Sequence, residues 1–176
     1  MRYILTLLFL FPIISTAEEL SQSLLSDFEI GIYLGNAEVS EGSFDDSSFA
    51  GLYLEVPVTN HFSFYASHRN IDKFIVNEQS KVVVDYDEKI ALGFGVFGNY
   101  NKKLSGYARI NFISWELDSV FSGNKLASER DESIGFSLGV KYLLLNKLGV
   151  NVEFFSVQDV SDADINSLSA GLFLLF

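Results

Sequence analysis

Apolar and polar residues alternate along most of this chain, which is the pattern of β-strands that have one apolar face. The alternation is clearest at 133–142, where every second residue is large and apolar: Ile134, Phe136, Leu138, Val140 and Tyr142. Seven further stretches alternate in the same way: 28–35, 51–58, 62–69, 89–100, 107–112, 148–154 and 165–176. The pattern therefore predicts an all-β protein with eight strands.

The connections between these stretches alternate in length. Long polar segments follow the first, third, fifth and seventh strands, at 40–49, 70–86, 116–132 and 157–164, whereas the other connections are short turns. An up-and-down barrel in a membrane has this arrangement, with tight turns on the periplasmic side and longer loops outside. We therefore expect an antiparallel up-and-down transmembrane β-barrel with both termini in the periplasm. The valines at 82–84 predict that one hairpin extends beyond the bilayer.

Composition distinguishes this barrel from a water-soluble one. Hydrophobic residues make up 48% of the chain although its net charge is −11, which fits apolar residues that face lipid and acids that lie in loops. A lipocalin-like barrel is the soluble alternative; its apolar face would point inward and its outer face would carry mixed charges. Here the second face is rich in glycine and serine with single charges, which favours a narrow, filled interior.

The amino-terminal segment has the features of a secretory signal. Residues 1–17 combine Arg2, an apolar run and a small-residue cleavage site that ends at Ala17. An uncleaved anchor is the alternative, but the run is shorter than the roughly 20 residues that a spanning helix needs. We expect 1–17 to be a signal peptide, 18–27 a short periplasmic lead-in and 28–176 the barrel domain, exported to the outer membrane.

Charged residues on the inward-facing positions form the first candidate site. Strand alternation places seven of them there: Glu29, Glu55, Arg69, Lys89, Arg109, Lys141 and Glu153. An eight-stranded barrel has room for side chains but hardly for a water column, so buried charges have to pair. We expect a structural ion-pair network in the lumen. A network that rearranges to open a narrow pore is the alternative.

Aromatic residues on the apolar face gather near one predicted rim. They are Phe28, Phe62, Tyr100, Tyr142 and Phe176. Aromatic girdles mark the interfaces of membrane barrels, so these five residues predict the periplasmic girdle.

The terminal segment Ser167–Phe176, the eight alternating strands and the signal peptide together resemble small eight-stranded outer-membrane β-barrels of Gram-negative bacteria. This family includes the OmpA membrane domain and the OmpX-like and opacity-like proteins. The resemblance covers 28–176 and implies that the barrel-assembly machinery recognises Phe176. It implies little about activity, because one fold hosts adhesins, structural proteins and enzymes.

The candidate chemistry is sparse. His61 and Ser63 share the spacing of a pair in the eight-stranded lipid A deacylases, but His61 falls in a predicted periplasmic turn. The chain has no cysteine and no metal-spaced histidine cluster, so we expect no cofactor, no metal and no enzymatic activity. A lipid A-modifying enzyme is the less favoured alternative.

The predicted loops and their ends carry 16 acidic residues against four basic ones. This charge argues against nucleic acid as a partner. The loops are either a solvated acidic surface or a site where divalent cations bridge to lipopolysaccharide. We expect a monomer that contacts outer-membrane lipid and lipopolysaccharide and meets an unknown surface ligand through its loops, in a structural or adhesin-like role.

Overall fold

The structure is a computed structural model, which describes residues 28–40, 46–59, 61–77, 82–122, 124–161 and 163–176. The predicted signal peptide and lead-in lie outside these ranges. Within them the chain forms nine strands: β1 (Glu29–Val39), β2 (Ser47–Pro57), β3 (Phe62–Ile71), β4 (Phe74–Asn77), β5 (Val82–Asn99), β6 (Leu104–Phe121), β7 (Asn124–Leu143), β8 (Leu148–Val160) and β9 (Ala163–Leu175). Across the same ranges no helix is both long and apolar enough to cross a bilayer.

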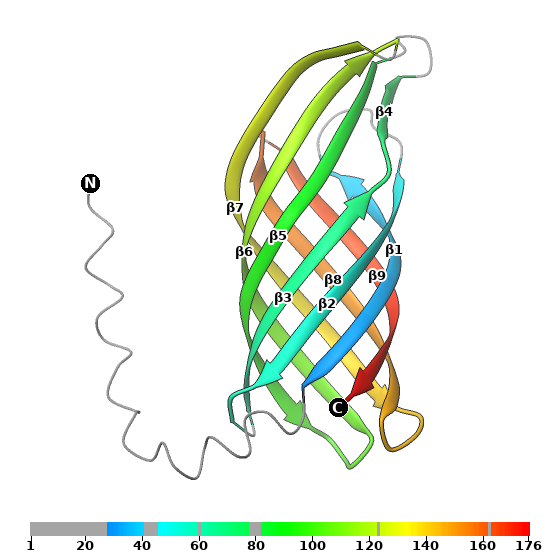
Figure 1. Ribbon diagram of the computed structural model, residues 1–176, viewed down its shortest axis with the longest axis vertical. Helices are drawn as coiled ribbons and strands as arrows, with labels where there is room; N and C mark the ends of the chain where they lie inside the picture. Colours follow the sequence, from blue (N-terminus) through cyan, green and yellow to red (C-terminus); the bar gives the residue numbers. More distant parts are fainter. Residues whose placement is uncertain (1–27, 41–45, 60, 78–81, 123, 162) are drawn as a thin grey trace, which may run out of the picture.

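Eight of the strands close into a barrel (Figure 1). Each strand pairs antiparallel with its neighbours in the order β3-β2-β1-β9-β8-β7-β6-β5, and β3 also pairs with β5, which closes the ring. The short strand β4 lies outside the ring and pairs only with the upper part of β5. The prediction of an eight-stranded antiparallel up-and-down barrel is therefore confirmed.

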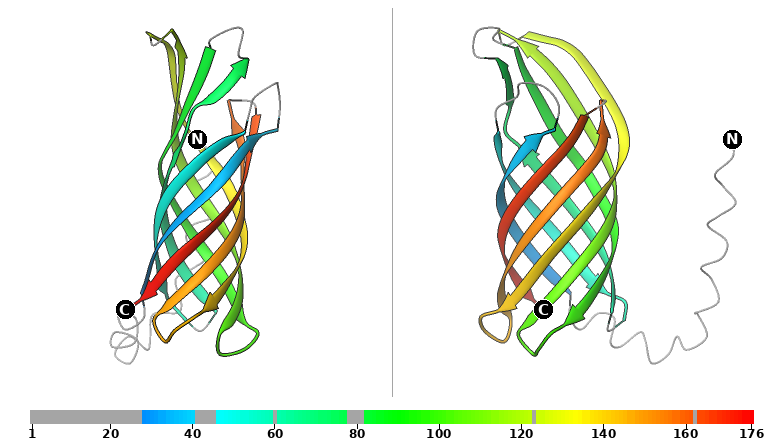
Figure 2. Two further views of the ribbon diagram at one scale, coloured as in Figure 1. Left: turned by 90° about the vertical axis from the view of Figure 1, so that its right-hand side faces the viewer. Right: turned by 180° about the vertical axis from the view of Figure 1, so that it is seen from behind.

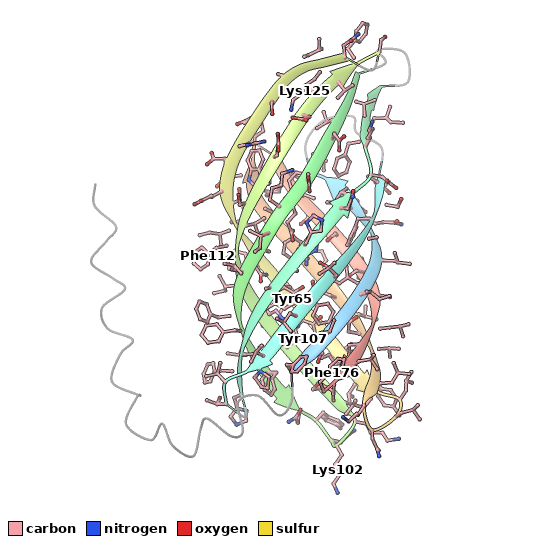
Figure 3. The ribbon with its side chains drawn as sticks, in the orientation of Figure 1. Tyr65, Lys102, Tyr107, Phe112, Lys125 and Phe176 are labelled. Carbon is pink, nitrogen blue, oxygen red and sulfur yellow. The ribbon has the colours of Figure 1, made fainter. Side chains whose placement is uncertain are left out.

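The barrel is apolar on its outside. Leu34, Leu138 and Leu168 are each at least 60% exposed, whereas the neighbouring inward positions are buried. A soluble barrel would hide these side chains, so the lipocalin-like alternative is wrong. In Figure 3 the ring of Phe112 projects from the outer surface, and Tyr65 and Tyr107 lie within the outline of the barrel. On β5, β6 and β7 the unbroken outward alternation of exposed apolar side chains ends at Ile90, Phe112 and Ile134, and we take these residues as the upper limit of a lipid-facing band.

Glycine faces the lumen where an aromatic ring needs the space of a missing side chain. A Cβ atom at Gly139 would overlap the Tyr107 ring and would lie 2.7 Å from the backbone oxygen of Val152. A Cβ atom at Gly31 would overlap the Tyr53 ring in the same way. The inward alternation of glycine and tyrosine thus packs large rings into a narrow barrel.

Replacing Gly139 with alanine should lower the free energy of unfolding by about 1–3 kcal/mol, because the added methyl overpacks the lumen against a backbone oxygen. Gly98 is the matched control, since a Cβ atom there would have nothing within 4 Å. Urea unfolding of the lipid-inserted protein measures both. Equal midpoints for Gly139→Ala and Gly98→Ala would contradict the packing of tyrosine against glycine.

Three strands continue well beyond the lipid-facing band. β6 and β7 remain paired up to Phe121 and Asn124, and β5 remains paired with β6 up to Val82, which lies opposite Phe121. Together with β4 they form a raised sheet made of 74–77, 82–89, 114–121 and 124–133, which stands above the other strands in Figure 2. The expected extension of the hairpin at 82–84 is confirmed.

The prediction of a long loop at 116–132 is wrong, because nearly all of this segment belongs to β6 and β7. Above the bilayer both faces of a strand can be polar, so the alternation that marks a membrane strand is lost. The predicted loop at 157–164 is also mostly strand, with Val160 paired to Ala163. The raised sheet is held instead from its inner face, where Trp115 packs near Tyr86 with ring centroids 6.4 Å apart.

Candidate functional site

An unbroken chain of ion pairs runs along the lumen. Seven charged side chains alternate in sign, and we call them the lumen ladder. From the end with the raised sheet to the end with the short turns, it runs in the order Glu88, Arg69, Glu153, Arg109, Glu55, Lys141 and Glu29. They come from seven of the eight barrel strands. The ladder contains four acids and three bases, and its two terminal members are both glutamates.

The two arginines carry the central part of the ladder. Arg69 donates to Glu88 and to Glu153, each at 2.9 Å. Arg109 donates to Glu153 and to Glu55, each at 2.5 Å. Each guanidinium thus joins carboxylates on two other strands, which links strands that are not neighbours in the sheet.

Lys141 completes the ladder at the end of the barrel with the short turns. Its ammonium group lies 2.8 Å from Glu29 and 2.5 Å from Glu55. Tyrosine hydroxyl groups also donate hydrogen bonds to these carboxylates: Tyr53 donates to Glu29 at 2.5 Å and Tyr107 donates to Glu153 at 2.9 Å. Buried charges need such additional partners, because each has lost its hydration.

Aromatic rings enclose the two arginines. The Arg109 guanidinium carbon lies 3.8 Å from the centroid of Tyr107 and 4.1 Å from that of Tyr65. The Arg69 carbon lies 3.5 Å from the centroid of Phe155. The flat guanidinium stacks on these faces, an arrangement that a lysine ammonium could not reproduce. The ladder and its rings fill the middle of the lumen.

The structure brings together six of the seven residues that the sequence predicted for the lumen. The prediction is wrong for Lys89, whose side chain is 47% exposed and pairs with Asp87 and Glu116 on the outside. The reason is a β-bulge: Glu88 pairs with Trp115 and Ile90 with Ser114, so Lys89 is the extra residue. The bulge turns Glu88, which the sequence assigns to an acidic loop, into the lumen. Strand alternation contains no signal for it.

A second set of charges lies on the outer face of the raised sheet, just above the lipid-facing band. This outer-face cluster consists of Asp87, Lys89, Glu116, Asp118, Lys125 and Arg130. Glu116 is its centre: Arg130 donates to both of its oxygens at 2.9 Å, and Lys89 approaches to 3.2 Å. Hydrogen bonds from Arg130 and Lys89 lower the pKa of Glu116 to about 2.

The lowered pKa of Glu116 predicts how the raised sheet responds to acid. The carboxylate contributes stability above its unfolded pKa of about 4.3, and this contribution is lost as the pH falls through the folded value. Trp115, the only tryptophan of the chain, precedes Glu116 in β6 and is buried on the inner face of the raised sheet. Its fluorescence therefore reports whether the raised sheet stays folded. Its emission should stay constant from neutral pH down to about 5 and shift to longer wavelength between about pH 4 and 2.

The Glu116→Gln variant is the control for this titration, and it should show a smaller acid step. The pKa of Asp118 is also lowered, by a hydrogen bond from Lys125, so some response remains. An equally large step in the variant would show that Glu116 does not hold the sheet.

The upper part of β7 is an edge strand. β7 pairs with β6 along its length, but its pairing with β8 begins only at Gly135. Residues 124–134 therefore have no strand partner on their second side among the described residues. In Figures 1 and 2 this part of β7 forms the outermost strand of the raised sheet. Its residues from Asn124 to Glu132 are exposed wherever the structure describes them.

The aromatic residues predicted for the periplasmic girdle lie at the end of the barrel with the short turns. Phe62, Tyr100, Tyr142 and Phe176 are each more than 40% exposed. Phe28 stacks on Phe176 with ring centroids 4.8 Å apart, and the Phe176 N–H donates to the Phe28 carbonyl at 3.0 Å. The last residue is thus tied to the start of the first strand.

The structure does not place His61 and Ser63 as a catalytic pair. His61 lies exposed in the turn before β3, where its ring contacts the Phe97 carbonyl at 3.4 Å. Ser63 points into the lumen and donates to Glu55 at 2.5 Å. In the part of the chain that the structure describes, no group of three or more His, Asp or Glu side chains is arranged to hold a metal ion.

The fold is similar to that of several solved outer-membrane proteins. Ail, the attachment invasion locus protein of Yersinia pestis, superimposes with a TM-score of 0.65 at 13% identity, covering 86% of this chain and 99% of Ail. Ail also has a structure in complex with the heparin analogue sucrose octasulfate. For Neisserial surface protein A the TM-score is 0.62 at 13% identity, covering 85% of this chain and 96% of that protein. For the amino-terminal barrel domain of Pseudomonas aeruginosa OprF the TM-score is 0.59 at 9% identity, covering 84% of this chain and 97% of that domain.

At these identities the likeness is one of fold. No curated protein matches this chain in sequence. The family model described as "Outer membrane protein beta-barrel domain" matches residues 5–176, nearly the whole chain, and the protein therefore belongs to this family and resides in the outer membrane.

Proposed function

We propose that this protein is a non-catalytic surface-interaction protein of the adhesin-like type, with the barrel as its anchor and the raised sheet as its working part. The observation that carries the proposal is the continuation of β5, β6 and β7 beyond the lipid-facing band. A barrel that only sealed a membrane would need no such extension. Outer-membrane lipid and lipopolysaccharide surround the band, and the barrel-assembly machinery inserts it.

The lumen supports an anchor better than a pore or an enzyme. The ladder and its aromatic rings occupy the interior, and the charged side chains there are engaged with one another. A nucleophile with a nearby base is the minimum for acyl-transfer chemistry, and the separation of His61 from Ser63 provides none at that position.

The charge of the raised sheet indicates the chemistry of the ligand. β7 carries Glu129, Asp131 and Glu132 in its exposed part, and long-range attraction would steer cations toward them. We therefore propose a cationic ligand surface for this chain, rather than a polyanion.

A shortened variant tests the proposal. Replacing residues 114–132 with Asn-Gly should leave Ile113 and Ser133 as the last pair before a tight turn, so that Glu129, Asp131 and Glu132 are removed and the lipid-facing band is untouched. Cells of a non-adherent Gram-negative strain that display the full chain should bind to polylysine-coated glass more than to heparin-coated glass. Cells that display the shortened chain should fall to the level of the empty vector.

Heat-modifiable migration on a gel confirms that the shortened barrel is folded. Equal binding by cells with the full and the shortened chain would overturn the proposal.

A further inference from the structure

We propose that the free edge of β7 binds an extended basic peptide segment of another protein as an added β-strand. This inference rests on the proposed surface-interaction function and names the kind of partner. An edge strand presents unpaired backbone donors and acceptors, and addition of a strand from another chain is a common way to satisfy them. The free stretch 124–134 spans about 35 Å, which is long enough for a specific partner.

The backbone geometry shows which groups would hold the added strand. Leu143 donates its N–H toward β6, to Lys103, whereas Leu144 donates toward β8, to Leu148. Backbone groups alternate in direction along a strand, and the β6–β7 register is constant from Tyr142 up to Ala127. The backbone N–H and C=O groups of the even-numbered residues of β7 therefore point away from β6. Above Gly135 this places the N–H and C=O groups of Ser128, Arg130 and Glu132 on the free edge.

The side chains on the edge indicate a basic partner. Glu129 lies opposite Leu117 and Asp131 lies opposite Trp115, so neither acid meets a cation across the sheet. The Glu129 carboxylate accepts only a hydroxyl, from Ser161 at 2.8 Å, among the described residues. Both acids lie on the inner face of the sheet at alternate positions. An added strand with lysine or arginine at every second residue would place its charges directly beside them.

A second copy of the chain is a poorer occupant. The antiparallel register that pairs the whole stretch 124–134 with itself would oppose the two Glu129 side chains. The register centred on Arg130 would oppose the two Arg130 side chains and would set Glu129 against Asp131. Like charges directly opposite each other destabilise a sheet. The edge is therefore better suited to a segment with a different sequence.

Peptide binding to the full barrel in lipid nanodiscs tests the inference. The probe is a capped octapeptide in which lysine alternates with threonine and valine, and the same peptide with glutamate for lysine is its counterpart. Fluorescence anisotropy should show binding of the lysine peptide only. Hydrogen exchange should show new protection of the amides of Ser128, Arg130 and Glu132.

Two matched variants separate strand addition from simple charge attraction. Ser128→Pro removes an edge N–H and should weaken binding by about tenfold or more, because a ladder hydrogen bond is lost and the ring obstructs its neighbours. Ser128→Ala keeps the N–H and should bind as the parent protein does. A Glu129→Gln, Asp131→Asn double variant should also weaken binding. Gel mobility confirms that each barrel is folded.

Unchanged binding by Ser128→Pro would overturn the inference, as would peptide-independent dimers that this variant abolishes. If the shortened barrel loses cell binding while Ser128→Pro retains it, the proposed function stands and the edge inference fails. If shortening has no effect on cell binding, the proposed function itself fails.

Discussion

Replacing Arg109 with methionine is expected to lower the free energy of unfolding by about 3–5 kcal/mol, because it leaves buried carboxylates without their cation. Arg109 is 2% exposed and bonds to Glu153 and Glu55 on two other strands. Methionine keeps much of the side-chain volume, so the loss reports charge pairing rather than a cavity. Urea unfolding in lipid vesicles, followed by the gel shift of the folded form, measures it.

Lys125→Met is the control, since Lys125 is a half-exposed cation at the top of the raised sheet. Exposed ion pairs contribute at most about 1 kcal/mol. Combining Arg109→Met with Glu55→Gln should recover part of the loss, because one stranded charge is removed. A cost for Arg109→Met no larger than that for Lys125→Met would contradict a structural role for the ladder.

Deleting Phe176 is expected to leave most of the protein unfolded and outside the membrane. The resemblance to small outer-membrane barrels implies that the assembly machinery recognises this residue. The structure adds a local reason, because Phe176 closes the join between the first and last strands through its stacking on Phe28. Outer-membrane fractionation combined with heat-modifiable migration would show the loss.

Phe154→Ala serves as the control for this deletion, since Phe154 is another lipid-facing phenylalanine but lies inside β8. It should assemble normally. Normal assembly of the chain without Phe176 would show that neither recognition nor strand closure depends on that residue.

The sequence was sufficient to predict the barrel because lipid enforces a strict alternation. On the outside of a bilayer-spanning strand every second residue has to be apolar, as at Ile134, Phe136 and Leu138, and a polar residue there is costly. The same alternation assigns Glu55, Arg109 and most of the other ladder residues to the inner face.

Alternation shows which face of a strand a residue lies on, but not its level along the barrel axis. The order of charges in the ladder could therefore not be predicted. The partner of each charge depends on the stagger between strands, and that stagger depends on the whole barrel. A single bulge reverses the assignment for Lys89 and Glu88. The raised sheet was missed at 116–132 because water accepts polar side chains on both faces, so no periodic signal remains there.

The environment of the outer surface gives the most direct test of the membrane barrel. Because the chain has no cysteine, single cysteines at Leu138, Leu172 and Lys102 can each carry a nitroxide label in lipid vesicles. The labels at Leu138 and Leu172 should collide with dissolved oxygen far more often than with a water-soluble nickel chelate, and the label at Lys102 should show the reverse. If the nickel chelate reaches Leu138 and Leu172 as readily as Lys102, the apolar face does not lie in lipid and the membrane barrel is contradicted.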